Sequence, residues 1–231
     1  MLFRSLDFTI NLLFPKFCLG CKKEGFWLCP DCQKSIEIFD SFYCPVCKKR
    51  LPDGKICEDC RRKTKLFRFF AAAPYDNNLT KELIHKLKYS FVKDISKDLA
   101  IPIVNFLKSL NSDFSEFLII PVPLHKSRLR WRGFNQANEI AKEISKFLKI
   151  PLISNNLVKI KSTKPQVEIS DSQKRKENVQ GAFRVKNPKI FAGKKIILVD
   201  DIYTTGSTME ECAKVLKRAG AKEIWGIVVA R

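Results

Sequence analysis

The chain of 231 residues has room for one domain of medium size and a second, small one, and a hydrophobic content of 45% is ample for a buried core. The formal net charge of +19 favours polyanionic partners: nucleic acid, phosphorylated metabolites or an anionic membrane surface. A general excess of lysine, with no consequence for partners, is the alternative explanation.

The first 17 residues form an apolar segment. Arg4, Asp7 and Asn11 interrupt its apolar run, which excludes a secretory signal, and the segment is too short to span a bilayer. The pattern is compatible with an amphipathic helix. We expect its apolar side chains to pack on the rest of the protein, and contact with a membrane surface is the alternative.

Cysteines dominate residues 18–62. The chain has nine, and eight of them form four Cys-x-x-Cys pairs. Nothing in the sequence exports the chain to an oxidising compartment, so zinc in the cytoplasm explains the pairs better than disulfides do. Two pairs complete one tetrahedral site, and four cysteines leave no open position for catalysis, so we predict two structural zinc ions. The predicted ligands are Cys18, Cys21, Cys29, Cys32, Cys44, Cys47, Cys57 and Cys60.

The spacing of these cysteine motifs favours one way of pairing them. The short gaps favour sequential pairing, with the first four cysteines on one zinc ion and the last four on the other. An interleaved arrangement stays open at this point. The apolar core of the segment is too small to fold alone, so metal binding is expected to supply the folding energy.

The next part of the chain predicts a strand followed by two helices. The strand spans about residues 69–75, and the helices span about 79–89 and 95–109. His85 lies off the apolar stripe of the first helix, so we expect it at the surface and not as a ligand. A basic linker, residues 61–69, joins this part to the cysteine-rich segment.

A loop dense in basic residues follows a buried strand that ends at Pro121. It leads to a helix from about Phe134 to Leu148. The loop leaves the C-terminal end of a strand, and arginine binds phosphate through paired hydrogen bonds, so we predict a clamp for a diphosphate or a contact with a nucleic-acid backbone. A basic turn that water satisfies is the alternative. The predicted ligand-binding residues are His125, Arg128, Arg130 and Arg132.

A short apolar run near the C-terminus, Ile196 to Val199, predicts a strand buried on both faces. Asp200 and Asp201 follow it, and a turn of small, hydroxyl-bearing residues then leads into a helix. We expect Ser207 or Thr208 to be the N-cap of this helix. Cys212 is predicted to be a core residue of the helix, and residues 223–230 form a final buried strand.

The residue types after this strand suit a phosphorylated sugar. A helix N-terminus offers free backbone N–H groups and a positive dipole end to a phosphate, and carboxylates suit sugar hydroxyls and a nearby Mg²⁺. Together these groups match a ribose 5-phosphate at the C-terminal end of a strand. A polar turn with two solvated aspartates is the alternative. The predicted phosphate contacts are Thr204, Thr205, Gly206, Ser207 and Thr208.

The stretch Val199-Asp-Asp-Ile-Tyr-Thr-Thr-Gly-Ser-Thr208 resembles the phosphoribosyl-diphosphate loop of type I phosphoribosyltransferases. Two further stretches are similar to the ComF family: Pro-x-Pro-Leu-His followed by Arg-x-Arg-x-Arg-Gly-Phe-Asn-Gln, and the loop around Lys164-Pro165-Gln166. The family usually has arginine early in that loop, where this chain has Lys159 and Lys161, and lysine lacks the paired contact of arginine. Long loops of this kind often form lids.

The resemblance extends from Cys18 to Arg231 and implies a fold and a biological role. It implies an α/β fold, the Rossmann-like parallel sheet of type I phosphoribosyltransferases, at residues 63–231, with a double zinc ribbon at 18–62 and the apolar segment at 1–17. It also implies a role in DNA uptake during natural competence. The protein would then act in the cytoplasm, at the inner face of the membrane, beside a helicase-like ATPase on single-stranded DNA.

Two functions from different classes follow. As an enzyme, the protein would transfer phosphoribose from phosphoribosyl diphosphate (PRPP) to an acceptor that the sequence does not reveal. Asp200 and Asp201 would hold the ribose hydroxyls, with Mg²⁺ on the diphosphate. As a binding module, it would contact the phosphates of single-stranded DNA, with Trp131, Phe134 or Tyr203 stacked on bases. We favour a DNA-uptake protein with an intact pocket for PRPP or another 5-phosphoribosyl ligand, and leave turnover open.

Overall fold

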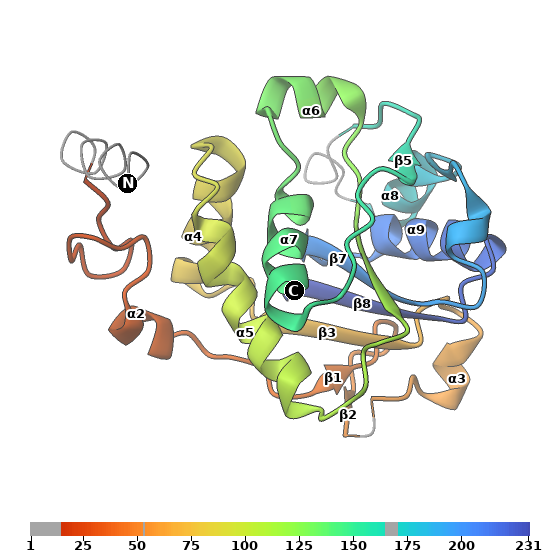
Figure 1. Ribbon diagram of the computed structural model, residues 1–231, viewed down its shortest axis with the longest axis horizontal. Coiled ribbons are helices and arrows are strands. Elements are labelled where there is room, and N and C mark those ends of the chain that lie inside the picture. The colour runs from red at the N-terminus through yellow and green to blue at the C-terminus, as the bar shows by residue number, and fades with distance from the viewer. Residues whose placement is uncertain (1–14, 53, 165–170) are drawn as a thin grey trace.

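The computed structural model describes residues 15–52, 54–164 and 171–231 (Figure 1). Its centre is a four-stranded sheet with the order β3-β8-β7-β4, in which all neighbouring strands are parallel. The strands are β3 (Arg68–Ala73), β4 (Phe117–Pro121), β7 (Lys195–Ile202) and β8 (Glu223–Ala230). The predicted α/β fold with a parallel sheet is therefore confirmed. Most of the predicted apolar segment, residues 1–14, lies outside the described residues.

Helices cover both faces of this sheet, because its strands are apolar on both sides. In β7, Ile197 and Val199 belong to one apolar cluster, and Ile196 and Leu198 belong to the other. The first cluster includes side chains of α4 (Asn78–Tyr89), α5 (Ile95–Ser109) and α7 (Gln136–Leu148), and the second includes side chains of α9 (Ser207–Arg218). Figure 1 shows α4, α5 and α7 together on the near side of the sheet.

Several predicted elements match the structure closely, and one does not. The predicted helix 95–109 and strand 223–230 coincide with α5 and β8. The basic stretch after β4 is expected to be a loop, but it contains the helix α6 (Lys126–Arg132). His125 caps this helix by accepting a hydrogen bond from the Ser127 N–H, at 3.3 Å, and Gly133 ends it in the left-handed conformation, with φ of 74°.

Residues 151–187, which show no clear periodicity, form short elements beside the sheet. The strands β5 (Leu157–Lys159) and β6 (Phe183–Val185) pair antiparallel, and α8 (Ser172–Val179) lies between them in the chain. A short 3₁₀ helix, η2 (Pro188–Ile190), leads back to β7. Pro165 and Gln166 of the predicted lid lie outside the described residues.

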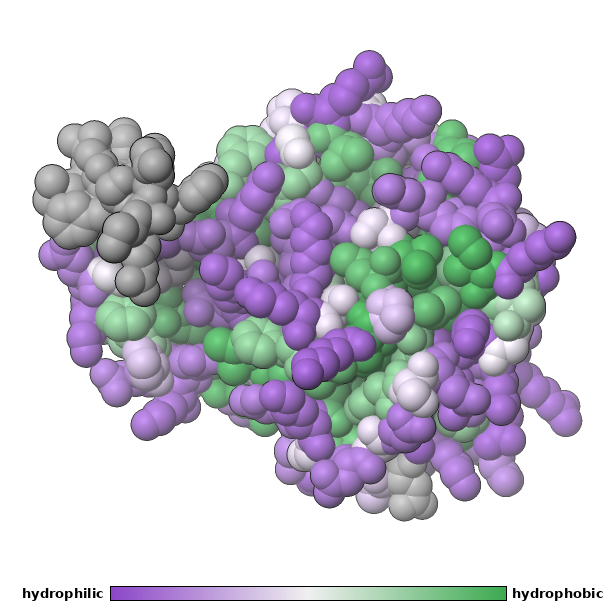
Figure 2. Space-filling view, in the orientation of Figure 1, coloured by the Kyte–Doolittle hydropathy of each residue, from purple (hydrophilic) through white to green (hydrophobic). Residues whose placement is uncertain are grey.

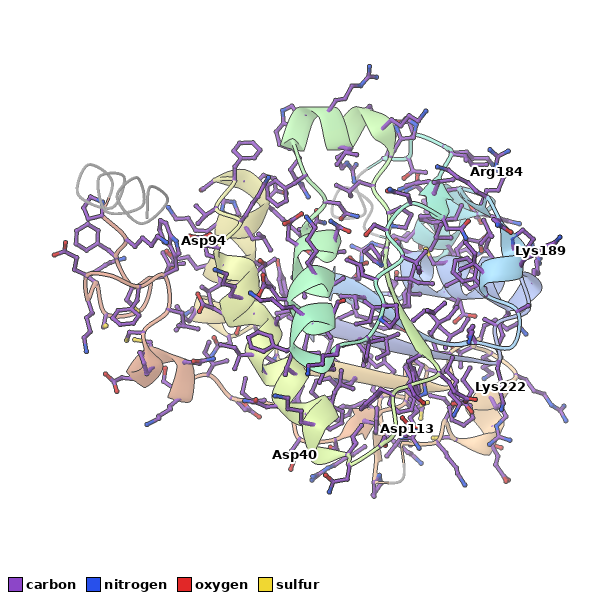
Figure 3. The ribbon with its side chains drawn as sticks, in the orientation of Figure 1. Asp40, Asp94, Asp113, Arg184, Lys189 and Lys222 are labelled. Carbon is purple, nitrogen blue, oxygen red and sulfur yellow. The ribbon has the colours of Figure 1, made fainter. Side chains whose placement is uncertain are left out.

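The cysteine-rich segment packs against the sheet and its helices. It contains α2 (Pro30–Lys34), β1 (Phe42–Tyr43), β2 (Arg50–Leu51) and α3 (Glu58–Arg61). The Phe42 ring meets the rings of Phe106 and Trp225 edge-on, with centroids 5.0 and 5.7 Å away. Lys16 forms an ion pair of 2.6 Å with Asp94, which Figure 3 labels. The segment therefore shares its core with the larger domain.

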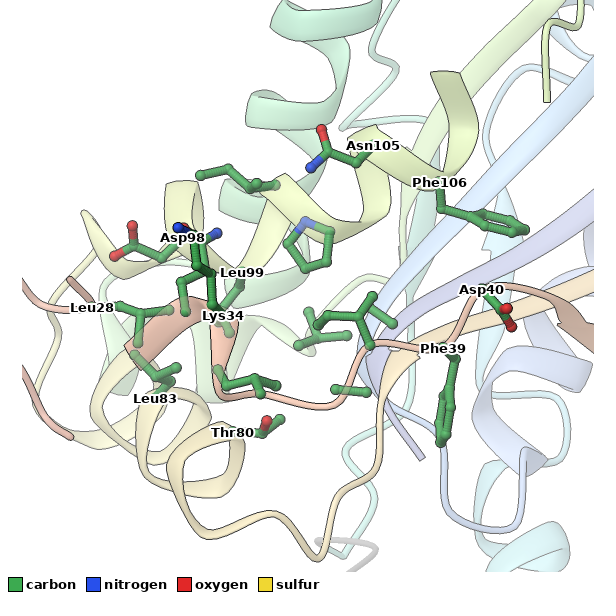
Figure 4. A pocket seen from close by; sticks show the side chains of 18 of the residues that line it. Leu28, Lys34, Phe39, Asp40, Thr80, Leu83, Asp98, Leu99, Asn105 and Phe106 are labelled. Carbon is green, nitrogen blue, oxygen red and sulfur yellow. The ribbon is translucent and has the colours of Figure 1, made fainter. Parts of the chain in front are cut away.

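A groove of about 600 Å³ lies between α2 and the helices α4 and α5 (Figure 4). Its walls are largely apolar, with Leu28, Leu83 and Phe106 among the residues that line it. Asp98 of α5 is an acidic residue in this groove.

The outer surface of the molecule is largely hydrophilic. Hydrophilic side chains cover most of the face drawn in Figure 2, with apolar patches between them. In the part of the chain that the structure describes, no helix has the length and apolar character to cross a membrane.

Candidate functional site

A cavity of about 600 Å³ opens where β4 and β7 end. Ligands of open parallel α/β sheets bind at this edge, outside the carboxyl ends of the strands. The cavity brings together nearly all residues predicted to bind a ligand: His125, Arg128, Arg132, Asp200, Asp201, Thr204, Thr205, Gly206, Ser207 and Thr208. Arg130 is not among the lining residues.

The two carboxylates occupy different environments, although they are adjacent in β7. Asp201 is 4% exposed and forms an ion pair with Lys88 at the end of α4. Burial acts to raise the pKa of Asp201, but the charge of Lys88 and its hydrogen bond outweigh burial and keep this pKa below its ordinary value. Burial and the charge of Asp201 raise the pKa of Asp200 well above its ordinary value. The pair therefore carries its negative charge mainly on Asp201.

Lys88 is a site residue that sequence reasoning missed. It lies in the last turn of α4, where a lysine is common because it favours the negative end of the helix dipole. Its side chain is only 17% exposed and lines the cavity. No sequence pattern reveals the contact with Asp201, because the contact depends on how α4 packs beside the end of β7.

The helix α6 separates the three arginines that the sequence places together. Residues four apart share one face of a helix, whereas residues two apart do not. Arg132 is 6% exposed, and its Nη1 donates a 2.7 Å hydrogen bond to Oε1 of Gln136. Arg128 donates to the Thr163 carbonyl at 3.5 Å. Arg128 and Arg132 therefore face the cavity, and Arg130 faces solvent.

The β7–α9 loop (residues 203–206) lines the cavity. Ser207 or Thr208 is expected as the N-cap of α9, but Gly206 takes that position, with φ of 75°. A side chain has no room there, because an added Cβ would lie 2.1 Å from the hydroxyl oxygen of Tyr203. Glycine thus permits both the backbone conformation and the close tyrosine. The N-terminus of α9 then lines the cavity, where its free N–H groups suit an anion.

A lysine from β5 completes the basic wall. Lys159 lines the cavity, and its Nζ donates to Oγ1 of Thr163 at 2.7 Å. Burial, together with the nearby charge of Arg128, lowers the pKa of Lys159. Arg175 of α8 also lines the cavity. The side chains that surround the two carboxylates are thus largely cationic, which suits a ligand with more than one phosphate.

The eight motif cysteines form two clusters, and the sequential pairing is confirmed. One cluster contains Cys18, Cys21, Cys29 and Cys32, and the other contains Cys44, Cys47, Cys57 and Cys60. Within each cluster the Sγ atoms lie within 4.8 Å of one another, and the Cys21–Cys29 and Cys47–Cys57 pairs are 3.6 Å apart. Tetrahedral zinc with Zn–S bonds of about 2.3 Å places its sulfur atoms about 3.8 Å apart. The donor sets therefore fit two structural zinc ions, and Cys212 is buried elsewhere.

Comparison with known proteins agrees with both parts of the structure. The family model of a phosphoribosyl transferase domain matches residues 131–231, and that of a double zinc ribbon domain matches residues 9–61. A hypoxanthine phosphoribosyltransferase from Staphylococcus aureus aligns over 59% of this chain and 63% of its own, with 10% identity and a TM-score of 0.35. That similarity is too weak to support an argument.

Relatives match over most of the chain. Competence protein F of Haemophilus influenzae is 30% identical over 226 residues, which cover 92% of this chain and 96% of the relative. DNA utilization protein YhgH of Escherichia coli K12 is also 30% identical over 226 residues, covering 93% and 97%. Competence protein ComFC of Bacillus subtilis is 29% identical over 207 residues, covering 84% and 79%. With its double zinc ribbon and its phosphoribosyltransferase-type domain, the chain therefore belongs to the ComF family.

Proposed function

We propose that the cavity binds PRPP, or another 5-phosphoribosyl ligand, together with Mg²⁺. The observation that carries this proposal is that a single cavity contains a helix N-terminus, two carboxylates and two inward-facing arginines. The 5-phosphate would bind at the N-terminus of α9 and the hydroxyls of Thr204 to Thr208. Asp200 and Asp201 would hold the ribose hydroxyls, and Arg128 and Arg132 would bind the diphosphate.

The carboxylates are also the groups that suit Mg²⁺. Among the described residues that line the cavity, Asp200 and Asp201 are the acidic ones, and carboxylate oxygen is a preferred ligand of Mg²⁺. When bound, the ion would neutralise charge on the diphosphate. Lys88 already neutralises the charge of Asp201 in the free protein. A bound cation or sugar hydroxyl would therefore stabilise the Asp200 carboxylate more than that of Asp201. Transfer of phosphoribose to an acceptor is the alternative activity of the same site.

We further propose that the protein handles single-stranded DNA during natural transformation, on the cytoplasmic side and beside a helicase-like ATPase. The names of the relatives, competence protein and DNA utilization protein, support this role, as does the net charge of +19.

A specific feature at the rim of the cavity favours DNA contact. Tyr89, Phe91 and Trp131 are 45%, 48% and 63% exposed, and Trp131 lies edge-on to the other two rings, with centroids 6.5 and 6.3 Å away. The guanidinium of Arg132 lies 5.5 Å from the centre of the Tyr89 ring. Exposed aromatic rings stack on unpaired bases, and cations beside the rings bind the phosphates that join those bases. Phe134 is buried and Tyr203 partly buried, which leaves Trp131 as the predicted stacking residue with an open face.

Thermal unfolding with PRPP and Mg²⁺ tests the ligand proposal. A ligand at a hundredfold excess over its dissociation constant stabilises the folded state by about 2.7 kcal/mol, so we expect a rise in Tm of roughly 5–10 °C. The rise should vanish in Asp200→Asn and persist in Glu82→Gln, a neutralised carboxylate at an exposed position of α4. An equal rise in wild type and Asp200→Asn would contradict the carboxylate role. No rise in wild type would reject the ligand and leave DNA binding as the better explanation.

A salt titration of single-stranded DNA binding tests the second proposal. Each lost phosphate contact reduces the slope of log affinity against log salt by about 0.7 for single strands. We expect Arg130→Ala to reduce the slope, because Arg130 faces solvent beside Trp131. Trp131→Ala should weaken binding by roughly 1–3 kcal/mol with little change of slope. The control is Lys189→Ala, at an exposed site away from α6 in Figure 3. Unchanged binding in both α6 variants would show that DNA does not use this face.

A further inference from the structure

We propose that the second zinc cluster, formed by Cys44, Cys47, Cys57 and Cys60, holds the β7–α9 loop in its binding conformation. Tyr203 and Glu210 are the positioning residues through which it acts. The inference rests on the proposed function of that loop in binding the 5-phosphate, and it gives the metal site a part in ligand recognition in addition to its structural one.

Tyr203 makes the first connection. Its hydroxyl donates a 3.2 Å hydrogen bond to the carbonyl oxygen of Pro45. Pro45 lies between Cys44 and Cys47, inside one of the two knuckles that would hold the zinc ion. The Tyr203 ring also packs on that of Phe69 in β3, and the two ring centroids lie 4.3 Å apart. The ring position therefore depends on the shape of the knuckle.

The Tyr203 ring in turn supports the turn at Gly206. A Cβ added to Gly206 would lie 2.1 Å from the tyrosine oxygen and 2.3 Å from Cζ, so ring and backbone are in direct contact. Gly206 is the N-cap of α9, the position that sets the direction of the helix N–H groups. A shift of the Tyr203 ring would thus displace the backbone N–H groups at the N-terminus of α9, which we propose as donors to the 5-phosphate.

Glu210 makes the second connection, after the loop in the chain. Its Oε2 accepts a 2.7 Å hydrogen bond from Oγ1 of Thr64, and its Oε1 accepts a 2.8 Å bond from the Lys65 N–H. Glu210 lies in the first turn of α9, and Thr64 follows the ligand Cys60 closely in the chain. The first residue of the loop and the first turn of α9 are therefore tied to the second cluster or to the segment that leaves it. Between these ties, Thr204 and Thr205 are exposed.

The first cluster offers a matched comparison, because its surroundings are different. Gly20, inside its first knuckle, lies against Leu79 of α4, and Lys16 beside it pairs with Asp94 at the start of α5. Cys21 and Cys47 are the corresponding exposed ligands of the two clusters. When bound, zinc crosslinks the four thiolates of a cluster and fixes both of its knuckles. Loss of the ion from the second cluster should therefore loosen the β7–α9 loop, and loss from the first should not.

The experiment compares Cys47→Ser, Cys21→Ser and Tyr203→Phe with wild type, with zinc content measured for each. In ligand-free protein, hydrogen–deuterium exchange of residues 203–210 should rise at least tenfold in Cys47→Ser and stay at the wild-type rate in Cys21→Ser. Tyr203→Phe should keep both zinc ions and its ring packing. It should nevertheless exchange faster in this segment and bind PRPP with Mg²⁺ roughly three- to tenfold more weakly, the loss expected for one neutral hydrogen bond.

The outcomes of these measurements distinguish failure of the inference from failure of the proposed function. Equal exchange of residues 203–210 in the two cysteine variants overturns the inference, whether both are slow or both are fast. If Cys47→Ser does not fold, Tyr203→Phe decides: wild-type exchange together with wild-type affinity overturns the inference. If wild type does not bind PRPP, the proposed function fails by itself, and the exchange measurements on free protein still test the coupling between the cluster and the loop.

Discussion

Lys88 reaches from the end of α4 to Asp201 at the end of β7, and both side chains are largely buried. A buried charge without a partner is costly, so this pair must form whenever the sheet and α4 pack together. One carboxylate is thereby kept ionised inside the cavity, and its neighbour Asp200 is pushed towards the protonated state. Two adjacent aspartates with the same chemistry acquire different roles because a single lysine is placed on one side of the strand.

Asp98, in the groove of Figure 4, is expected to make stability depend on pH. Burial, aided by the charge of Asp94, raises the pKa of Asp98 from 3.8 to about 6. A carboxyl with a higher pKa in the folded state favours folding while protonated. This contribution is complete below pH ~4 and is lost as the pH rises through about 6. We therefore expect the Tm of wild type to fall relative to that of Asp98→Asn over this range. Parallel Tm curves would contradict the prediction.

The helix α6 places three arginines that look equivalent in the sequence in different environments. Its two turns place Arg128 and Arg132 against the cavity and Arg130 in solvent. Its C-terminal end also exposes Trp131, which lines the cavity at its rim, next to Arg132 in the chain. The two proposed functions therefore draw on neighbouring side chains of the same element.

This division predicts a difference between two alanine variants. Arg128→Ala should weaken PRPP binding by roughly 1.5–3 kcal/mol, because a hydrogen bond to a charged group is lost from a partly buried site. Arg130→Ala on the solvent face should bind PRPP within about twofold of wild type. Isothermal titration calorimetry with Mg²⁺ measures both. Equal losses in the two variants would mean that the ligand does not distinguish the faces of α6.

Sequence patterns predicted the elements whose periodicity is strong. The apolar run at Ile196 identified β7, and apolar spacing identified α5 within a residue at each end. The basic stretch hid α6, because closely spaced arginines look the same in a solvated turn and in a short helix. The N-cap of α9 is Gly206 and not Ser207 or Thr208. The sequence did not reveal this, because it is the packing of Tyr203 against Gly206 that excludes a side chain there. Contacts such as Lys88 with Asp201 join distant parts of the chain, and local patterns carry no information about them.

At the scale of the whole molecule, the zinc ribbon and the sheet share one core. Phe42, Leu51 and Ile56 of the ribbon belong to the same apolar cluster as side chains of α5 and β8. Phe39 extends this contact through its N–H, which donates to the Ala72 carbonyl of β3 at 2.9 Å. The predicted division at residues 18–62 and 63–231 separates stretches of sequence, and we propose that these stretches fold as one cooperative unit.

Phe42→Ala tests this cooperativity. Phe42 is 3% exposed, and its replacement by alanine should lower the free energy of unfolding by roughly 3–5 kcal/mol. We expect one transition in urea, with ribbon and sheet unfolding together, when zinc release and far-UV circular dichroism are followed in parallel. Val46→Ala in the same ribbon is the control, because Val46 is 37% exposed and should change stability little. Zinc release well before loss of the sheet would separate the two parts.

The position of β8 has a consequence for how the chain folds during synthesis. β3 and β7 do not pair with each other, and β8 lies between them, so that Arg68 has Trp225 as its partner across the ladder. A strand that follows both β3 and β7 in the chain is thus needed to connect them within the sheet. While the ribosome still holds Glu223–Ala230, β3 has no partner strand in the sheet. Such non-local pairing slows folding, so this sheet is complete only after residues 223–230 have emerged from the ribosome.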